Sequence, residues 1–318
     1  MQIIVIDGHT LNPGDLDWNG LRAFGDVTMY ESTLAEQITE RCKHAEIILT
    51  NKVPVSAATI EAAKNLKLIC VTATGFNIVD VDAASKRNIP VCNVPDYGTS
   101  SVAQHTFALI LELANRIGTN SSAVREGDWE RSGDFCFSKG RITELQGKTI
   151  GIVGLGKIGA QVARLAAAFE MRVIYYSQTK KANDIATYAE LEEVFSQSDV
   201  VSLHCPLTRN NNQFVNQNLL SKMRPSAWII NTSRGQLINE NDLADALNTD
   251  RIAAAALDVL SVEPPPSTNP LLRAKNCVIT PHTAWMSLEA RKRILSVTLQ
   301  NIGCYLEGKP QNVVFVKP

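Results

Sequence analysis

Short runs of β-branched and aliphatic residues alternate with segments of helical spacing along most of this 318-residue chain. In the first hundred residues the apolar runs are QIIVID (2–7), EIILTN (46–51), LKLICVTA (66–73) and PVCNV (90–94). Buried parallel strands typically read as near-continuous apolar runs of this kind, with helices between them. The alternation therefore predicts an α/β unit built around a parallel sheet.

A second alternating series begins in the middle of the chain. Its strand-like runs are TIGIVG (149–154), MRVIYYS (171–177), VVSLHC (200–205), AWIINTS (227–233), IAAAALDVL (252–260) and CVITPH (277–282). A helical segment from Ser100 to Gly127 and a loop rich in glycine and aromatic residues precede this series. The segment 286–309 predicts a closing amphipathic helix, and NVVFV (312–316) predicts a late strand that returns to the first sheet.

The length and the order of these elements predict two domains, one inserted into the other. A chain of 318 residues exceeds the usual size of a single domain. We expect residues 1–98 and 285–318 to form one domain and residues 99–284 to form the inserted one. Two crossings between such domains make a hinge with a cleft, which is a common place for a ligand.

The second series opens on a glycine-rich turn with a specific spacing. Gly154, Gly156 and Gly159 follow an apolar strand and open an amphipathic helix, and the next strand ends about 20 residues later. This context predicts a Rossmann domain that binds a dinucleotide, the alternative being only a tight strand–helix turn. Backbone N–H groups from Gly154 to Gly159, including those of Lys157 and Ile158, would bind the diphosphate at the start of the helix.

The end of the next strand bears on the choice between NADH and NADPH. Proteins that prefer NAD usually carry an acidic residue there for the ribose hydroxyls, whereas this chain has Ser177. Ser177 does not repel a phosphate, and Lys180 and Lys181 could neutralise one. We therefore expect Ser177 and Lys180 to contact the cofactor and NADPH to be preferred, the alternative being that both lysines lie on a solvated turn.

Composition excludes several classes of protein. Thirty-one basic and 32 acidic residues give a net charge of −1 without long runs of either sign, which does not suggest a nucleic-acid or membrane-surface protein. No run approaches the roughly 20 apolar residues of a membrane span, and we expect no signal peptide, because Met1 leads directly into the strand-like run QIIVID. The seven scattered cysteines form no CxxC pair, so we expect reduced thiols, a cytoplasmic protein and no metal site.

Three charged or titratable residues each follow a strand of the second series. Arg234 stands in INTSRG, Glu263 in LDVLSVEPPP and His282 in ITPHTAW. Taken singly, they are explained by a surface ion pair, a loop charge and a satisfied histidine. Ligands of open α/β sheets bind beyond the carboxyl ends of the strands, so we expect all three to face one crevice.

The chain resembles the D-2-hydroxyacid dehydrogenase family over essentially its whole length. The matching stretches are ATGFNIVDVDAA, VCNVPDYGTSSVAQHTFALIL, GKTIGIVGLGKIG, HCPLT, NTSRG, LDVLSVEPPPSTNPLL and TPHTAW. EPPPSTNPLL and PHTAWMSLEAR are most similar to the glycerate dehydrogenase, or hydroxypyruvate reductase, branch. The resemblance implies a Rossmann domain inserted into a flavodoxin-like substrate domain.

The resemblance implies roles that agree with the chemistry of reducing a 2-oxo acid. His282 would donate the proton to the carbonyl oxygen and act as the base in reverse, and an imidazole in water titrates near pH 6.5. Glu263 would bond to the other ring nitrogen and orient it. Arg234 would hold the carboxylate and keto oxygen of the substrate, because its planar fork matches them better than lysine does.

The resemblance also implies contacts elsewhere. In the first domain, backbone N–H groups of Thr74, Gly75 and Phe76 would bind the substrate carboxylate, the alternative being an ordinary strand-end turn. Asp258 would contact the nicotinamide carboxamide. The other matched positions that line the cofactor groove are Cys205, Pro206 and Thr232.

The expected activity is reduction of hydroxypyruvate, and of glyoxylate, with NAD(P)H. One alternative keeps the mechanism and changes the substrate to D-lactate or another small 2-hydroxy acid. A second, from a different class, is a dinucleotide-sensing binding protein of the corepressor type. The resemblance implies a homodimer paired through the helix from Ser100. For Phe135 and Phe137 in the loop beyond, the alternatives are packing within their own subunit and contact with the neighbouring subunit. We expect His105 to be buried in that helix and not catalytic.

Overall fold

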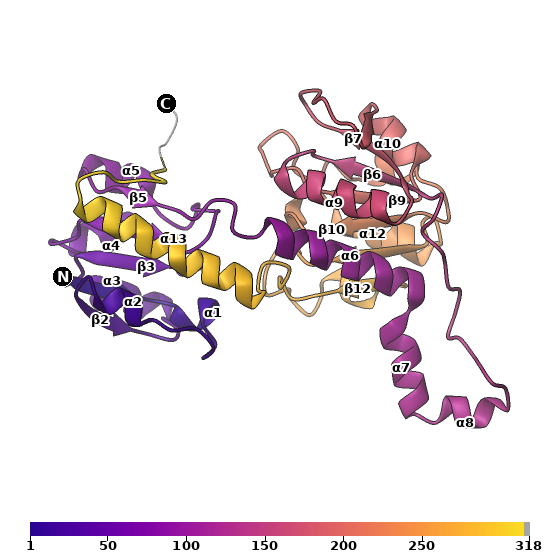
Figure 1. Cartoon of the computed structure of the whole chain (residues 1–318), viewed down its shortest axis with the longest axis horizontal. Coiled ribbons are helices and arrows are strands. Elements are labelled where there is room, and N and C mark those ends of the chain that lie inside the picture. Colours follow the sequence, from indigo (N-terminus) through magenta and orange to yellow (C-terminus); the bar gives the residue numbers. More distant parts are fainter. Residues whose placement is uncertain (315–318) are drawn as a thin grey trace. The chain divides into compact units, whose positions relative to one another are not determined.

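The chain builds two parallel sheets in turn, and its last helix packs on the first of them (Figure 1). The computed structural model describes residues 1–314 and divides into two units. One unit holds Met1–Gly98 and the chain from Met286, and the other holds Thr99–Trp285. Trp285 thus lies in the second unit, one residue beyond the boundary expected from the sequence.

The first unit has a five-stranded parallel sheet with strand order β2-β1-β3-β4-β5, which is the flavodoxin-like order. Its strands are β1 (Gln2–Val5), β2 (Asp26–Met29), β3 (Ile47–Thr50), β4 (Leu68–Val71) and β5 (Val91–Cys92). Its helices are α1 (Gly8–Leu11), α2 (Asn19–Arg22), the 3-10 turn η1 (Ala35–Gln37), α3 (Ile38–Cys42), α4 (Ala57–Ala62), α5 (Val81–Lys86) and α13 (Leu288–Leu306). The sequence missed β2, because this edge strand is largely exposed and has no apolar run.

Both faces of this sheet are buried, which explains the unbroken apolar runs. Ile4 and Ile48 pack on one face, whereas Ile3 and Ile47 pack on the other beside Ile302 of α13. The late strand returns to this sheet as expected, since Val313 pairs antiparallel with Cys92 and the N–H of Val314 donates to the carbonyl of Val91 at 2.8 Å. The last residues of the predicted strand, 315 and 316, lie outside the described residues.

The second unit has a seven-stranded parallel sheet with strand order β12-β11-β10-β9-β6-β7-β8. Counted from β6, this is the Rossmann order 3-2-1-4-5-6 with one further strand. The strands are β6 (Thr149–Val153), β7 (Arg172–Tyr176), β8 (Ala186–Tyr188), β9 (Val200–Leu203), β10 (Trp228–Asn231), β11 (Ala254–Leu257) and β12 (Cys277–Ile279). The fold class predicted from the sequence is confirmed, although the three-residue edge strand β8 was not expected.

Helices cover both faces of the second sheet. They are α6 (Thr99–Asn115), α7 (Ile117–Arg125), α8 (Asp128–Ser132), α9 (Lys157–Ala168), α10 (Leu191–Gln197), α11 (Gln217–Leu220), α12 (Glu240–Asn248) and the 3-10 turns η2 (Gly235–Leu237) and η3 (Pro270–Arg273). One core contains Phe107 of α6 and Val162 of α9, and the other contains Phe195 of α10 and Leu243 of α12. The cores place α6 and α9 on one face and α10, α11 and α12 on the other (Figure 1).

The helical segment predicted from Ser100 is broken at Arg116. This residue has a left-handed backbone, with φ of 52°, so α6 ends before it and α7 begins after it. Helices α7 and α8 and the loop that follows extend from the rest of their unit (Figure 1). Within residues 1–314, no helix is both long enough and apolar enough to cross a membrane.

Candidate active site

The three glycines of the turn after β6 have different roles, and one of them lets a ligand approach the backbone of the turn. Gly154 has a φ of +102°, and a Cβ there would lie 2.6 Å from the backbone nitrogen of Cys205. A Cβ on Gly159 would lie 2.2 Å from the carbonyl oxygen of Gly154, so this glycine lets α9 pack against the turn. A Cβ on Gly156 would meet no atom within 4 Å. The first and third glycines are therefore required by the fold, and the second faces open space.

The start of α9 fits a diphosphate. Gly156 is the N-cap residue and offers no side chain to the first turn, which begins at Lys157 and Ile158. The N–H groups of a first turn have no partners within the helix and carry the positive end of its dipole. A diphosphate in the open space beside Gly156 would meet these groups, as dinucleotides do in this fold.

Residues 177–183, directly after β7, include the two lysines and no acidic side chain. The Ser177 hydroxyl donates to the carbonyl of Thr179 at 2.6 Å. The Lys181 ammonium donates to the carbonyl of Leu155 in the glycine turn at 2.9 Å, and the Lys180 ammonium lies 4.2 Å from the ring centre of Tyr188. The contact of Lys181 with the glycine turn was not expected from the sequence.

His282 and Glu263 meet at the carboxyl ends of neighbouring strands. His282 follows β12 and Glu263 follows β11, and their Nδ1 and Oε2 atoms are 2.6 Å apart. The other carboxylate oxygen of Glu263 accepts the N–H of Leu260 at 2.9 Å, which fixes the carboxylate. The side chains of His282 and Glu263 are 30% and 36% exposed, so a substrate can reach them. With Nδ1 on Glu263, Nε2 is the nitrogen left for proton exchange.

Arg234 stands at the carboxyl end of the next strand, β10. Its guanidinium donates to the carbonyl of its neighbour Ser233 at 2.7 Å. Its backbone is fixed by Asn231, whose amide donates to the Arg234 carbonyl at 2.9 Å. The Ser233 hydroxyl donates to the carbonyl of Cys205 at 2.6 Å, which ties this segment to the end of β9.

The loop that carries Glu263 is held by contacts that the sequence did not reveal. Glu240 accepts the N–H and the hydroxyl of Ser261 at 2.7 and 2.8 Å, and the amide of Asn269 at 2.9 Å. A Cβ on Gly235 would lie 1.9 Å from the carbonyl carbon of Leu260, so only glycine allows the two segments to touch. The roles of Glu240 and Asn269 were missed because the sequence does not show which segments they contact, although Asn269 lies in the matched stretch EPPPSTNPLL.

Asp258 is a buried carboxylate at the end of β11, and its side chain is 1% exposed. Burial alone would raise its pKa, but hydrogen bonds from His105, Thr280 and the N–H groups of Ala284 and Thr283 outweigh burial and lower it. The carboxylate is therefore ionised at neutral pH and bound to the segment that carries His282. Its contact with a nicotinamide stays a prediction.

His204 and Cys205 follow β9 and are both neutral near pH 7. Burial lowers the pKa of His204 to about 4, and its Nε2 lies 2.8 Å from the Ser202 hydroxyl. Burial raises the pKa of Cys205 to about 11. Across residues 1–314, no three His, Cys, Asp or Glu side chains are grouped so that they could hold a metal ion.

In the first unit, the predicted substrate loop follows β4. The Thr74 hydroxyl donates to the carbonyl of Val94 at 2.8 Å, and the Asn93 amide donates to the carbonyl of Thr74 at 2.7 Å. Phe76 packs against the core of this unit and Gly75 lies between the two. The loop is thus anchored at both ends, as a rigid backbone donor site requires.

Comparison with known proteins decides the family. The family described as D-isomer specific 2-hydroxyacid dehydrogenase, NAD binding domain, matches residues 107–284. The chain belongs to the D-isomer specific 2-hydroxyacid dehydrogenases. It is therefore an oxidoreductase of 2-hydroxy acids that uses a nicotinamide dinucleotide.

Relatives resemble this dehydrogenase along its whole length. It is 45% identical to a hydroxypyruvate reductase of Blautia hydrogenotrophica over 320 residues, which cover 99% of each chain. It is 36% identical to a glycerate dehydrogenase of Methylorubrum extorquens over 316 residues, or 98% of each chain. Among solved structures, an acyclic imino acid reductase in complex with NADPH and D-Arg is 32% identical, with a TM-score of 0.86 over 99% of this chain and 100% of that one.

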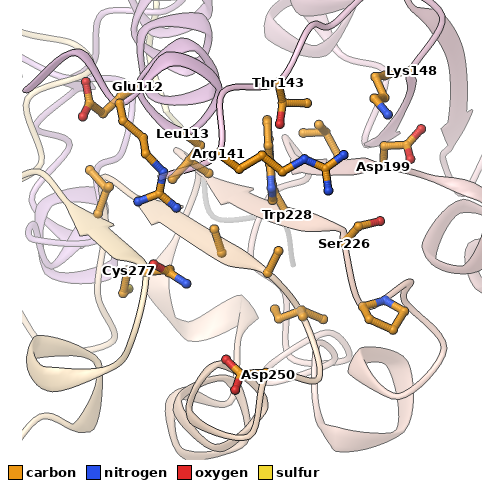
Figure 2. Close-up of a pocket in the computed structure, with 18 of the residues that line it drawn as sticks. Glu112, Leu113, Arg141, Thr143, Lys148, Asp199, Ser226, Trp228, Asp250 and Cys277 are labelled. Atoms are coloured by element: carbon orange, nitrogen blue, oxygen red, sulfur yellow. The ribbon is translucent and has the colours of Figure 1, made fainter. Parts of the chain in front are cut away.

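The second unit of the dehydrogenase also holds a pocket of about 810 Å³, at the amino ends of the strands (Figure 2). Lys148, Asp199 and Trp228 line it, each at or just before the start of a strand. Glu112 of α6 and Arg141 also line it (Figure 2). The pocket therefore lies at the opposite edge of the sheet from Arg234, Glu263 and His282, and it is not the site of the proposed chemistry.

Proposed function

We propose that this dehydrogenase reduces hydroxypyruvate to D-glycerate, and also reduces glyoxylate to glycolate. The observation that carries the proposal is the His282–Glu263 pair, 2.6 Å apart and partly exposed at the strand ends beyond the glycine turn. The substrate class is supported by the hydroxypyruvate reductase and the glycerate dehydrogenase, which resemble the chain over nearly its full length.

His282 supplies the proton in this reaction. In the imidazolium form, its Nε2–H donates to the carbonyl oxygen of the 2-oxo acid while Nδ1–H stays on Glu263. The negative Glu263 orients the ring and stabilises the imidazolium before transfer. A reduced nicotinamide supplies the hydride to the carbonyl carbon when it is bound. In the oxidative direction, neutral His282 accepts the hydroxyl proton through the same nitrogen.

Arg234 holds the substrate in register for this transfer. Its guanidinium turns from the Ser233 carbonyl to the carboxylate and keto oxygen, where two parallel N–H donors match two oxygens. Backbone N–H groups of Thr74, Gly75 and Phe76 bind the carboxylate, and the anchored ends of that loop support this role. The remaining proposed cofactor contacts are Gly154, Gly156, Lys157, Ile158, Gly159, Ser177, Lys180, Cys205, Pro206, Thr232 and Asp258.

NADPH is the proposed coenzyme in preference to NADH. Residues 177–183 after β7 include Ser177, Lys180 and Lys181, and the end of the strand carries no carboxylate that would repel a 2′-phosphate. An acyclic imino acid reductase with 32% identity is bound to NADPH in its solved structure. Comparison of kcat/KM for the two reduced coenzymes tests this choice, and a clear preference for NADH would refute it.

A panel of 2-oxo acids tests the proposed substrate. Purified protein and reduced coenzyme are mixed with hydroxypyruvate, glyoxylate, pyruvate or a longer 2-oxo acid, and loss of the reduced nicotinamide is followed by its absorbance. The highest kcat/KM is expected with hydroxypyruvate. A higher kcat/KM with pyruvate would identify a D-lactate dehydrogenase instead. Coenzyme binding without turnover of any of the acids would identify a dinucleotide-sensing protein.

We further propose that the chain acts as a homodimer in the cytoplasm. The segment 117–142 has five large exposed apolar side chains, and exposed apolar surface favours an interaction with a partner. They are Ile117, Val124, Trp129, Phe135 and Ile142. Phe135 is 90% exposed, which favours its contact with the partner subunit over packing within its own subunit. Sedimentation of the wild type and of Phe135→Ser tests this, and a monomer at micromolar wild-type concentration would refute it.

A further inference from the structure

Helix α6 places three polar side chains on the segments that carry the proposed catalytic residues. The Ser101 hydroxyl donates to the carbonyl of Ala284 at 2.7 Å. His105 Nε2 lies 3.0 Å from the Thr280 hydroxyl, and the Thr106 hydroxyl lies 3.0 Å from that of Thr232. Ala284 and Thr280 stand two residues to either side of His282, and Thr232 stands two residues before Arg234.

His105 completes a network centred on Asp258. The Thr280 hydroxyl donates to Asp258 Oδ1 at 2.6 Å, so its single proton is used there. Thr280 can then only accept from His105, which places the proton of the imidazole on Nε2. The same nitrogen lies 3.3 Å from Asp258 Oδ1, so its N–H is shared between the hydroxyl and the carboxylate.

Asp258 in turn fixes both sides of His282. Its Oδ1 accepts the N–H of Thr283 at 2.8 Å, and its Oδ2 accepts the N–H of Ala284 at 2.9 Å. Its backbone carbonyl accepts the N–H of His282 itself at 2.9 Å. His282 therefore stands in a short segment that one buried aspartate binds through the Thr280 hydroxyl on one side and through two backbone N–H groups on the other.

This support matters because His282 has an unfavourable backbone conformation. Its φ is 55°, in the left-handed region that non-glycine residues seldom adopt. Such a conformation persists where the surrounding structure imposes it. If the support weakens, the segment relaxes and the imidazole leaves the geometry that proton transfer requires.

We propose that His105 is a positioning residue for His282, acting through Thr280 and Asp258. The inference rests on the proposed role of His282 as the acid. The Nε2–H of His105 holds the Thr280 hydroxyl and the Asp258 carboxylate in the orientation that fixes residues 280–284. The His105 imidazole contacts Thr280 and Asp258, and it acts on His282 only through them.

Three variants on one helix test the proposal. His105→Leu removes the donor, His105→Gln keeps an N–H near the position of Nε2, and Gln104→Ala changes an exposed neighbour. For each folded variant, kcat, KM for the 2-oxo acid, dissociation constants of the coenzyme and the melting temperature are measured.

A positioning role predicts a specific split between these quantities. His105→Leu should lower kcat roughly 10- to 100-fold, with KM and coenzyme affinity within about threefold of wild type. His105→Gln should recover most of kcat, and Gln104→Ala should match wild type. A kcat for His105→Leu within twofold of wild type would overturn the proposal, as would a Gln variant no better than the Leu variant.

Two further measurements keep the test decisive. If His105→Leu does not fold, Thr280→Val breaks the same link at its other end and should show the same fall in kcat with little change in KM. A Thr280→Val variant with normal kcat would then overturn the proposal. His282→Ala is measured in parallel, because normal turnover in that variant rejects the proposed function itself and not only the role of His105.

Discussion

The two edges of the second sheet share the same seven strands and differ in what they carry. The carboxyl edge bears His282 and Glu263, held 2.6 Å apart, and Asp258, which binds two backbone N–H groups. The amino edge bears a pocket of about 810 Å³ lined by residues such as Asp199 and Trp228 (Figure 2). This pocket and the His282–Glu263 pair thus lie at opposite edges of one sheet.

A pocket of this size does not by itself identify a site of reaction. Parallel strands turn their carboxyl ends and the following loops to one edge, where polar side chains and helix N-termini gather. Proton transfer depends on donors and acceptors fixed by hydrogen bonds and not on empty space. We therefore propose that catalysis takes place at the carboxyl edge.

The largest effect is expected from removal of the imidazole at the carboxyl edge. His282→Ala should lower kcat roughly 10²–10⁴-fold, because the proton must then come from water. Coenzyme binding, followed by fluorescence of the reduced nicotinamide, should change little because the glycine turn is intact. Near-normal turnover in this variant would move the chemistry away from this edge.

A smaller effect is expected from a change of cation at the same edge. Arg234→Lys keeps the charge and loses the planar fork, so substrate binding and turnover should both weaken. We expect kcat/KM to fall about 30- to 100-fold, with contributions from KM and kcat, which steady-state rates over a range of substrate concentrations separate. Unchanged values of both constants would contradict the assignment of Arg234.

The partly buried imidazole of His204, also at the carboxyl edge, should make stability depend on pH. Its folded pKa of about 4 lies below the value near 6.5 in an unfolded chain. The unfolded state therefore binds the proton first, and stability falls as pH drops through 6.5 towards 4. Between pH 7 and pH 5 this group should cost about 2 kcal/mol of unfolding free energy.

Urea unfolding at a series of pH values measures the contribution of His204 to the free energy of unfolding. His204→Gln should flatten the dependence of unfolding free energy on pH by about that amount, since the amide does not titrate. The matched control is His44→Gln, a change at an exposed histidine of the first unit. Equal pH dependence in wild type and His204→Gln would show that His204 is not kept neutral by burial.

The smallest effect is expected at the amino edge. Asp250 lines the pocket there and pairs with Lys275 at 3.2 Å, with both side chains more than half exposed. Asp250→Asn should leave kcat/KM within twofold of wild type and change the unfolding free energy by less than about 0.5 kcal/mol. A tenfold loss of kcat/KM with an unchanged melting temperature would tie the pocket to catalysis.

Much of the fold could be predicted from local sequence. Strands buried on both faces, such as β6 and β9, are continuous apolar runs and were found. Strands β2 and β8 were missed because they are short, lie at sheet edges and are partly exposed. The end of α6 was missed because a left-handed arginine, at position 116, has no signature in sequence.

In the candidate site too, local sequence located some residues, whereas the contacts that support them appear only in the tertiary structure. Arg234, Glu263 and His282 were located because each follows a strand, and the structure brings His282 and Glu263 together. Their catalytic roles stay predictions. The contact of His105 with Thr280 joins residues 175 positions apart, so no local pattern announces it. Supporting groups of this kind become visible only when the tertiary structure is known.

A double-mutant cycle on His282 and Glu263 tests the central claim most directly. The claim is that the two side chains act as one acid–base unit at the carboxyl edge, with Glu263 working through the imidazole. In the wild-type background Glu263→Gln should lower kcat for hydroxypyruvate about tenfold or more. In the His282→Ala background the same substitution should change kcat by less than twofold, because its target is gone. Equal effects of Glu263→Gln in both backgrounds would show that the residues act independently and would contradict the account.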